Sequence, residues 1–97
     1  MNKINEISLS AVIACYKDEK AIPIMHQRLT EVFKKIGCKY EIIFVNDGSP
    51  DNSEQVLEEI CASDQSTTAI IHSRNFNSQN AFTSGMMQST GDAVILL

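Results

Sequence analysis

The stretch that decides the fold is Tyr40–Pro50, which reads YEIIFVNDGSP. Its first six residues are almost continuously apolar, which is typical of a strand covered on both faces of a sheet. The five residues that follow, Asn46–Pro50, have the composition of a turn. A buried strand that runs directly into polar turn residues is characteristic of an α/β unit, and the rest of the chain repeats this pattern.

Three more apolar runs occur at regular intervals, at Leu9–Cys15, Thr68–His72 and Ala93–Leu97. Helix-compatible stretches separate the four runs, and the last of these stretches is Gln79–Ser89. Strands that alternate with helices predict β-α-β units with right-handed crossovers. We therefore predict a three-layer α/β/α, Rossmann-like fold with a mostly parallel sheet of about four strands.

Each helical stretch carries its own signals. Pro23 suits the first turn of the first helix, and Gly37 suits its C-terminal cap. Asp51 followed by Glu54 resembles a capping box, so we expect the second helix to begin near Asn52. In the first helix, apolar residues at steps of three and four predict one buried face made of Ile22, Met25, Leu29, Val32, Phe33 and Ile36. In the third helix the inward candidates are Ala81, Phe82, Gly85 and Met86.

The composition restricts the classes of function. The 97 residues suit a single domain, and the net charge is −4. Because no Lys/Arg cluster extends beyond Lys34 and Lys35, we expect no nucleic-acid partner. Cys15, Cys38 and Cys61 form no C-x-x-C pair, so we expect reduced thiols packed as small hydrophobic groups. The longest apolar runs have about five residues against roughly 20 for a membrane span, and we expect a soluble, cytoplasmic piece.

Polar residues directly follow three of the apolar runs, at Tyr16–Glu19, Asn46–Ser49 and Ser73–Asn77. Ligands of open α/β sheets bind outside the carboxyl ends of the strands, so we expect these segments to share one edge. An aromatic ring, carboxylates and an arginine suit a base, a ribose and a phosphate. The sequence has neither a P-loop nor a G-x-G-x-x-G pattern. It also shows no obvious partner for the two histidines, so we expect His26 to be a solvated helix residue and His72 a strand-end residue.

Four motifs together resemble those of family 2 glycosyltransferases, which are inverting enzymes of the GT-A fold. The motifs are VIACYKDE (Val12–Glu19), EIIFVNDGSPDNS (Glu41–Ser53), SRNF (Ser73–Phe76) and TGDAVILL (Thr90–Leu97). The resemblance covers nearly the whole chain in the right order and spacing. It is nearest to the polyprenyl-phosphate and dolichyl-phosphate sugar transferases.

The resemblance implies roles for six residues. Ala14 and Tyr16 correspond to positions that wrap the nucleotide base, and Asp18 to the acidic position just behind them. Asp47 matches the aspartate that accepts a hydrogen bond from the base, typically uracil. The remaining two matches, Arg74 and Asn75, belong to the loop beside the diphosphate and the sugar.

The chain also departs from the family pattern. Ala14 stands for the usual Pro, Lys17 for the usual Asn, and Asn46 for the usual first Asp of a pair. Asn77-Ser78 stands where the family has Gly-Lys or Gly-His, which removes a phosphate contact. These departures bear on the choice of donor.

The chain ends inside its fourth apolar run, which we interpret as the sign of a longer parent protein. The resemblance implies that the parent continues into an Asp-x-Asp motif that holds Mg²⁺ or Mn²⁺ and, further on, into a general base. We then expect the 97 residues to bind a nucleoside-diphosphate sugar of the UDP type, without a metal ligand or catalytic residue of their own. The parent would transfer the sugar to a lipid phosphate, polysaccharide or other acceptor, with membrane association at the cytoplasmic face.

Alternatives stay open at this stage. The apolar terminus Val94–Leu97 also suits a non-catalytic nucleotide-binding or self-associating α/β module, and we expect a homo-oligomer. An unrelated nucleotide-binding protein such as a nucleotidyltransferase would need a Gly/Lys/Arg-rich loop after the first strand, which Tyr16–Lys20 does not supply. Asp47 could simply stabilise its turn, and we expect Asp51 to cap a helix rather than to bind a ligand.

Overall fold

The computed structural model describes residues 7–73 and 78–97. Strands and helices alternate along them, and the strands and α3 begin and end within one residue of the predicted ranges. The elements are β1 (Ser8–Cys15), α1 (Ala21–Ile36), β2 (Lys39–Asn46), α2 (Ser53–Ser63), β3 (Thr67–Ile71), α3 (Ser78–Gln88) and β4 (Ala93–Leu96).

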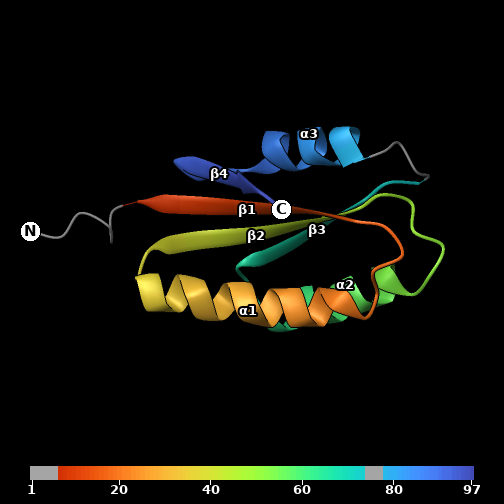
Figure 1. The fold of residues 1–97 in the computed structure, drawn as a ribbon, viewed down its shortest axis with the longest axis horizontal. Coiled ribbons are helices and arrows are strands. Elements are labelled where there is room, and N and C mark those ends of the chain that lie inside the picture. The colour runs from red at the N-terminus through yellow and green to blue at the C-terminus, as the bar shows by residue number, and fades with distance from the viewer. Residues whose placement is uncertain (1–6, 74–77) are drawn as a thin grey trace, which may run out of the picture.

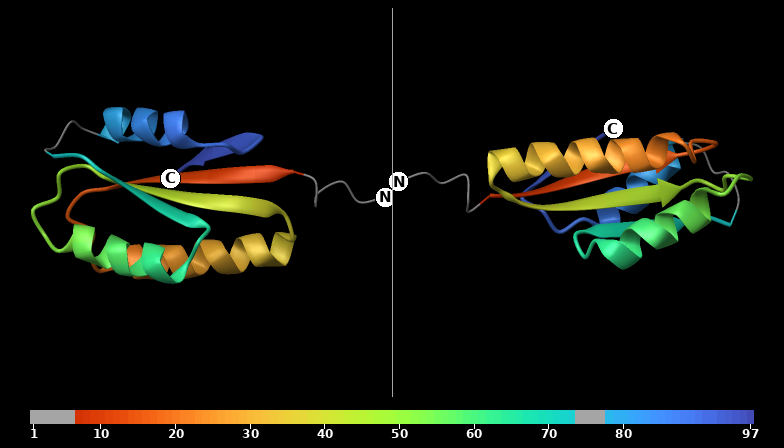
Figure 2. Two further views of the ribbon diagram at one scale, coloured as in Figure 1. Left: turned by 180° about the vertical axis from the view of Figure 1, so that it is seen from behind. Right: turned by 90° about the horizontal axis from the view of Figure 1, so that it is seen from below.

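The strands form one parallel sheet in the order β3-β2-β1-β4. Helices α1 and α2 cover one face of this sheet and α3 covers the other (Figure 1), as the views from behind and from below also show (Figure 2). The predicted three-layer α/β/α fold is therefore confirmed. The strand order reverses between β1 and β4, and in sheets of this kind such a reversal marks the ligand-binding crevice at the carboxyl ends.

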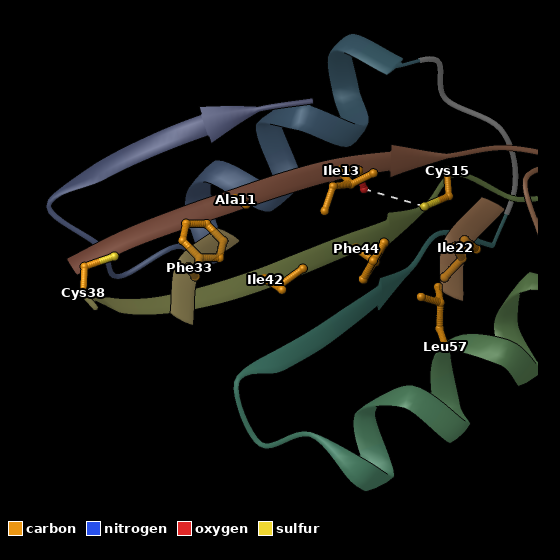
Figure 3. Packing of buried hydrophobic residues seen from close by; sticks show 9 residues of the cluster. All are labelled: Ala11, Ile13, Cys15, Ile22, Phe33, Cys38, Ile42, Phe44 and Leu57. Carbon is orange, nitrogen blue, oxygen red and sulfur yellow. Dashed lines mark hydrogen bonds between the residues drawn. The ribbon is translucent and has the colours of Figure 1, made fainter. Parts of the chain in front are cut away.

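Successive residues of each strand point to opposite faces of the sheet, so the core consists of two clusters, one on each face. On β2, Ile42 and Phe44 face α1 and α2, whereas Ile43 and Val45 face α3. The larger cluster fills the layer between the sheet and the two helices (Figure 3). Its buried members are Ala11, Ile13, Cys15, Ile22, Phe33, Cys38, Ile42, Phe44 and Leu57.

The ends of α1 match the prediction, but its buried face is narrower than predicted. Gly37 takes the left-handed conformation (φ 80°) and donates its N–H to the carbonyl of Phe33, as a C-terminal cap does. Phe33 is buried and its ring stacks on Tyr40 at 4.8 Å. Val32 and Ile36, however, are 51% and 38% exposed. Neighbouring helix residues point about 100° apart, so Val32 cannot share the sheet-facing direction of Phe33.

Helix α3 packs closely on β1 through a glycine. Ala81 and Gly85 face the sheet as predicted, but Met86 is 43% exposed. A Cβ atom added to Gly85 would lie well under 3.0 Å from the Cγ1 atom of Val12, so the helix and the strand approach each other closely at this point. This approach fixes the distance between α3 and the sheet.

The motif Thr90-Gly91-Asp92 lies at the opposite edge of the sheet from the strand carboxyl ends and has a structural role there. The Glu41 carboxylate accepts hydrogen bonds from the hydroxyl of Ser10 at 2.5 Å and from the N–H of Thr90 at 2.6 Å. Burial alone would raise the pKa of Glu41, but these hydrogen bonds outweigh it and lower the pKa below its ordinary value of 4.5. A Cβ on Gly91 would meet the Ser10 hydroxyl at 2.5 Å, so glycine is required where the chain enters β4.

Candidate functional site

The ends of the three consecutive strands are tied together by backbone hydrogen bonds. The N–H of Asp47 donates to the carbonyl of Cys15 at 2.9 Å, and the N–H of His72 donates to the carbonyl of Asn46 at 2.9 Å. The residues that directly follow β1, β2 and β3 therefore meet at one edge, as the sequence predicts, and the three strands end on the same side of the sheet in Figure 1. Arg74 and Asn75 lie outside the described residues.

The loop after β1 exposes Tyr16 and contains a local hydrogen bond that holds the Asp18 side chain. The Tyr16 side chain is 40% exposed, and its backbone N–H donates to the carboxylate of Asp18 at 3.2 Å. The carbonyl of Asp18 accepts the N–H groups of Ala21 and Ile22, which begins α1. Lys17, between Tyr16 and Asp18, has a backbone φ of 59°. Its ammonium group is 5.4 Å from the centre of the Tyr16 ring.

Ala14 and Asp18 line the same small cavity at the reversal of strand order. The cavity has a volume of about 190 Å³ and also contacts Leu97, which follows β4. Ala14 itself is partly buried, whereas Asp18 is exposed. Two of the six residues predicted for the site are thus brought together by the fold at the place where ligands of open α/β sheets bind.

Asp51 holds the loops after β1 and β2 together. One carboxylate oxygen of Asp51 accepts hydrogen bonds from the hydroxyls of Ser49 and Ser53, and from the Ser53 N–H at 3.0 Å. The other oxygen accepts the N–H of Glu19 at 3.3 Å. Burial disfavours the charge, but the hydrogen bonds outweigh it and lower the pKa of Asp51 to about 2. Asp51 thus caps the first turn of α2 in place of Asn52, in keeping with the structural role predicted for it.

Asp47, His72 and Ser84 form a chain of hydrogen bonds across three elements. The Asp47 residue follows β2 and is only 3% exposed. Its carboxylate lies 3.0 Å from Nδ1 of His72, and Nε2 of the same ring lies 2.9 Å from the hydroxyl of Ser84 on α3. The expectation that His72 has no obvious partner is therefore wrong.

The interpretation of His26 as a solvated residue is also wrong. Its Nε2 lies 2.7 Å from the carboxylate of Asp64, which follows α2. Burial opposes ionisation of Asp64, but hydrogen bonds from His26, Ser66 and Thr67 together lower its pKa. Both histidine pairs join residues at least 25 positions apart, so no local spacing in the sequence could reveal them. The signal for His72 is that, like Asp47, it directly follows a strand.

Cys15 lies at the same edge but is not a nucleophile. The thiol is buried, and burial together with the charges of Asp18 and Asp51 raises its pKa to about 12. Since the thiolate is the reactive form, the group is inert near neutral pH. The three cysteines are free thiols, and Cys15 and Cys38 are buried among the core residues as predicted.

The described residues carry neither a cluster of metal ligands nor a membrane span. Within 7–73 and 78–97, His, Cys, Asp and Glu form no group of three that could hold a metal ion. Over the same residues, no helix combines the length and the apolar character that crossing a bilayer requires.

The parallel sheet between two layers of helices, with polar loops at the carboxyl ends of its strands, defines a Rossmann-like α/β domain. A solved structure shares this fold. A mannosyltransferase from Pyrobaculum calidifontis, solved in complex with GDP-Man and Mn²⁺, matches 89% of the chain with a TM-score of 0.68 at 13% sequence identity. That match covers 25% of the mannosyltransferase chain.

The chain belongs to glycosyl transferase family 2, whose profile matches residues 10–97. It is 41% identical over 90 residues to an undecaprenyl-phosphate 4-deoxy-4-formamido-L-arabinose transferase of Pseudomonas fluorescens. It is 33% identical over 89 residues to a prophage bactoprenol glucosyl transferase homolog of Escherichia coli. Each alignment covers 92% of this chain but only 26% and 29%, respectively, of these relatives.

Proposed function

We propose that the chain is the N-terminal, nucleotide-sugar-binding part of a glycosyltransferase catalytic domain. The whole protein would transfer a sugar from a nucleoside-diphosphate donor to a lipid phosphate, with inversion. Membership of glycosyl transferase family 2 supports the reaction class, and the names of the two relatives support a lipid-phosphate acceptor. Such an acceptor would bring the whole protein to the cytoplasmic face of a membrane.

In this proposal the edge residues divide the recognition of the donor. Tyr16 stacks on the base, because its ring is exposed beside the strand ends. Asp47 accepts a hydrogen bond from the base, and Asp18 and Ala14 line the neighbouring crevice. Arg74 and Asn75 would lie beside the diphosphate and the sugar, as the family resemblance implies. The observation that carries the proposal is the buried Asp47 carboxylate, held by backbone and side-chain bonds at the end of β2.

A divalent cation, Mg²⁺ or Mn²⁺, would bind to the whole protein, as Mn²⁺ does in the structure of the Pyrobaculum calidifontis mannosyltransferase. The cation would neutralise the charge of the leaving nucleoside diphosphate. Asp18 and Asp51 already accept hydrogen bonds from backbone and serine donors, and within residues 7–73 and 78–97 no group of three His, Cys, Asp or Glu side chains could hold the ion. Within the described residues we therefore assign roles in nucleoside recognition and none in metal binding.

Calorimetric titration with UDP tests the proposal. Asp47→Asn replaces one carboxylate oxygen with an NH₂ group and removes the charge. It should weaken UDP binding about tenfold or more, as expected for the loss of a charged hydrogen-bond acceptor. Asp92→Asn, at the opposite edge of the sheet, serves as the matched control and should leave the dissociation constant unchanged. Equal affinities of the wild type and Asp47→Asn would reject the assignment of Asp47 to the base.

A second candidate function is self-association through β4. This strand forms one end of the sheet, and Val94, Ile95 and Leu96 are 37%, 39% and 46% exposed. Edge strands with exposed apolar residues pair readily with a second chain. Light scattering over a range of concentrations would give a dimer mass if β4 pairs with its copy. A monomer mass throughout the concentration range would reject this candidate.

A further inference from the structure

The hydrogen-bonded chain Asp47–His72–Ser84 joins three elements that the sequence keeps far apart. Asp47 follows β2, His72 follows β3, and Ser84 lies within α3 on the face of the sheet opposite α1 and α2 (Figure 2). The side chains of His72 and Asp47 are only 13% and 4% exposed. Because the ring is fixed at both nitrogens, its orientation relative to the Asp47 carboxylate is fixed as well.

The chemistry of the three groups determines where the protons lie. An ionised carboxylate only accepts hydrogen bonds, so Nδ1 of His72 must carry the proton that faces Asp47. In the neutral ring Nε2 is then an acceptor, and the hydroxyl of Ser84 is its donor. The Asp47 carboxylate therefore sets the tautomer of His72, Ser84 holds the ring at its other nitrogen, and the held ring in turn orients the carboxylate.

The same order of residues occurs in hydrolases with a serine nucleophile, but the position of Ser84 does not suit attack on a substrate. Ser84 lies inside α3, where backbone N–H groups are committed to carbonyls four residues earlier. The helix thus offers no N–H groups for an oxyanion hole beside this hydroxyl. The geometry suits a supporting chain for Asp47.

We propose that His72, with its ring held in place by Ser84, is a positioning residue that aims the Asp47 carboxylate and thereby selects a pyrimidine base with a hydrogen on ring nitrogen 3. The proposal rests on the assignment of Asp47 to the base. Uracil carries a donor at N3, whereas cytosine presents a lone pair there, which a fixed carboxylate repels. A carboxylate that can rotate would discriminate less between the two bases.

Two amide replacements of His72, asparagine and glutamine, separate a positioning role from a contribution to stability alone. The amide nitrogen of asparagine occupies nearly the place of Nδ1, whereas that of glutamine reaches the place of Nε2. His72→Asn should therefore keep the donor to Asp47, and His72→Gln should lose it. His26→Asn is the matched control, because His26 also pairs with an aspartate but lies on α1, away from the strand ends.

The experiment measures dissociation constants for UDP and CDP by calorimetry and the Tm of each variant. The wild type, His26→Asn and His72→Asn should prefer UDP over CDP by about tenfold, and His72→Gln and Ser84→Ala should bring this ratio close to one. A ratio that stays at the wild-type value in His72→Gln, whatever its Tm, would overturn the proposal.

A second readout separates this proposal from the proposed function. ¹⁵N NMR of the ring should show the Nδ1–H tautomer of His72 in the wild type and also in Ser84→Ala, because the Asp47 carboxylate holds that proton in both proteins. Preference for UDP without that tautomer would overturn the role of His72 and leave the nucleotide site standing. The tautomer without any effect of Asp47→Asn on UDP binding would reject the base site and the selectivity proposed here with it.

Discussion

Replacing Gly85 with alanine tests how closely α3 packs on β1. The added Cβ atom would lie well under 3.0 Å from Cγ1 of Val12, whereas ordinary contacts begin at 3.4 Å. Val12 is fully buried and pairs with Ile43 on one side and Leu96 on the other, so the sheet holds its backbone in place. Its β-branched side chain has few alternative rotamers. The clash can therefore be relieved mainly by moving α3 outward.

The expected cost follows from two opposing effects. Overpacking of a well-packed core destabilises a protein by about 1–3 kcal/mol, and a clash with a rigid side chain belongs at the upper end. Alanine offsets about 1 kcal/mol of this cost, because it favours a helix over glycine by that amount. We expect a net loss of about 2 kcal/mol in the free energy of unfolding, or a fall in Tm of about 8–16 °C for a chain of this size.

Urea denaturation of four proteins provides the assay: the wild type, Gly85→Ala, Val12→Ala and the double variant. Val12→Ala alone should cost about 1–3 kcal/mol through the cavity it leaves. In that background the methyl group added by Gly85→Ala fills vacated space, so this substitution should become neutral or stabilising by up to about 1 kcal/mol. If the two single effects instead add within about 0.5 kcal/mol, the close approach of α3 to β1 is refuted.

Three further predictions concern single residues. Lys17 has a left-handed φ of 59°, a backbone conformation that asparagine tolerates better than lysine. Lys17→Asn should therefore raise the free energy of unfolding by about 0.5–1 kcal/mol in urea denaturation, and no change or a loss would contradict backbone strain at this residue. Glu41→Gln should lower stability by about 1–2 kcal/mol at pH 7. Because the pKa of Glu41 is lowered in the folded state, its contribution to stability is present above pH 4.5 and should vanish as the pH falls through the folded pKa. A difference in stability between the wild type and Glu41→Gln that does not change with pH would contradict this prediction. Iodoacetamide at pH 8 should modify the partly exposed Cys61 well before the buried Cys15, as peptide mass spectrometry would show, and fast labelling of Cys15 would contradict its raised pKa.

The candidate site was predictable from the sequence only in part. The positions of Tyr16, Asp18 and Asp47 follow from a local rule, because each closely follows a strand that its apolar run makes visible. The hydrogen bonds that hold Asp47 do not follow, because they depend on which residue of another strand lies opposite. The sequence therefore indicated a polar edge with Asp47 in it, while the roles of His72 and Ser84 emerged only from their contacts.

The helices show the same division. Gly37 and the inward position of Gly85 were predictable, since caps and helical periodicity are properties of a few neighbouring residues. The exposure of Val32 was not predictable, because several rotations of an apolar helix satisfy the same periodicity. Packing of Phe33 on Tyr40 selects one of these rotations and turns Val32 to the outside.

The sequence by itself determined the elements of this protein, their α/β class and the family to which its motifs point, because apolar runs, turn residues and motif spacing are read along the chain. Only the tertiary structure decided the strand order β3-β2-β1-β4, the hydrogen bond between Glu41 and Thr90, and the support of Asp47 by His72 and Ser84. The physical reason is that such contacts join residues 12–49 positions apart. Their partners are selected by the packing of the whole chain and by no pattern within one segment.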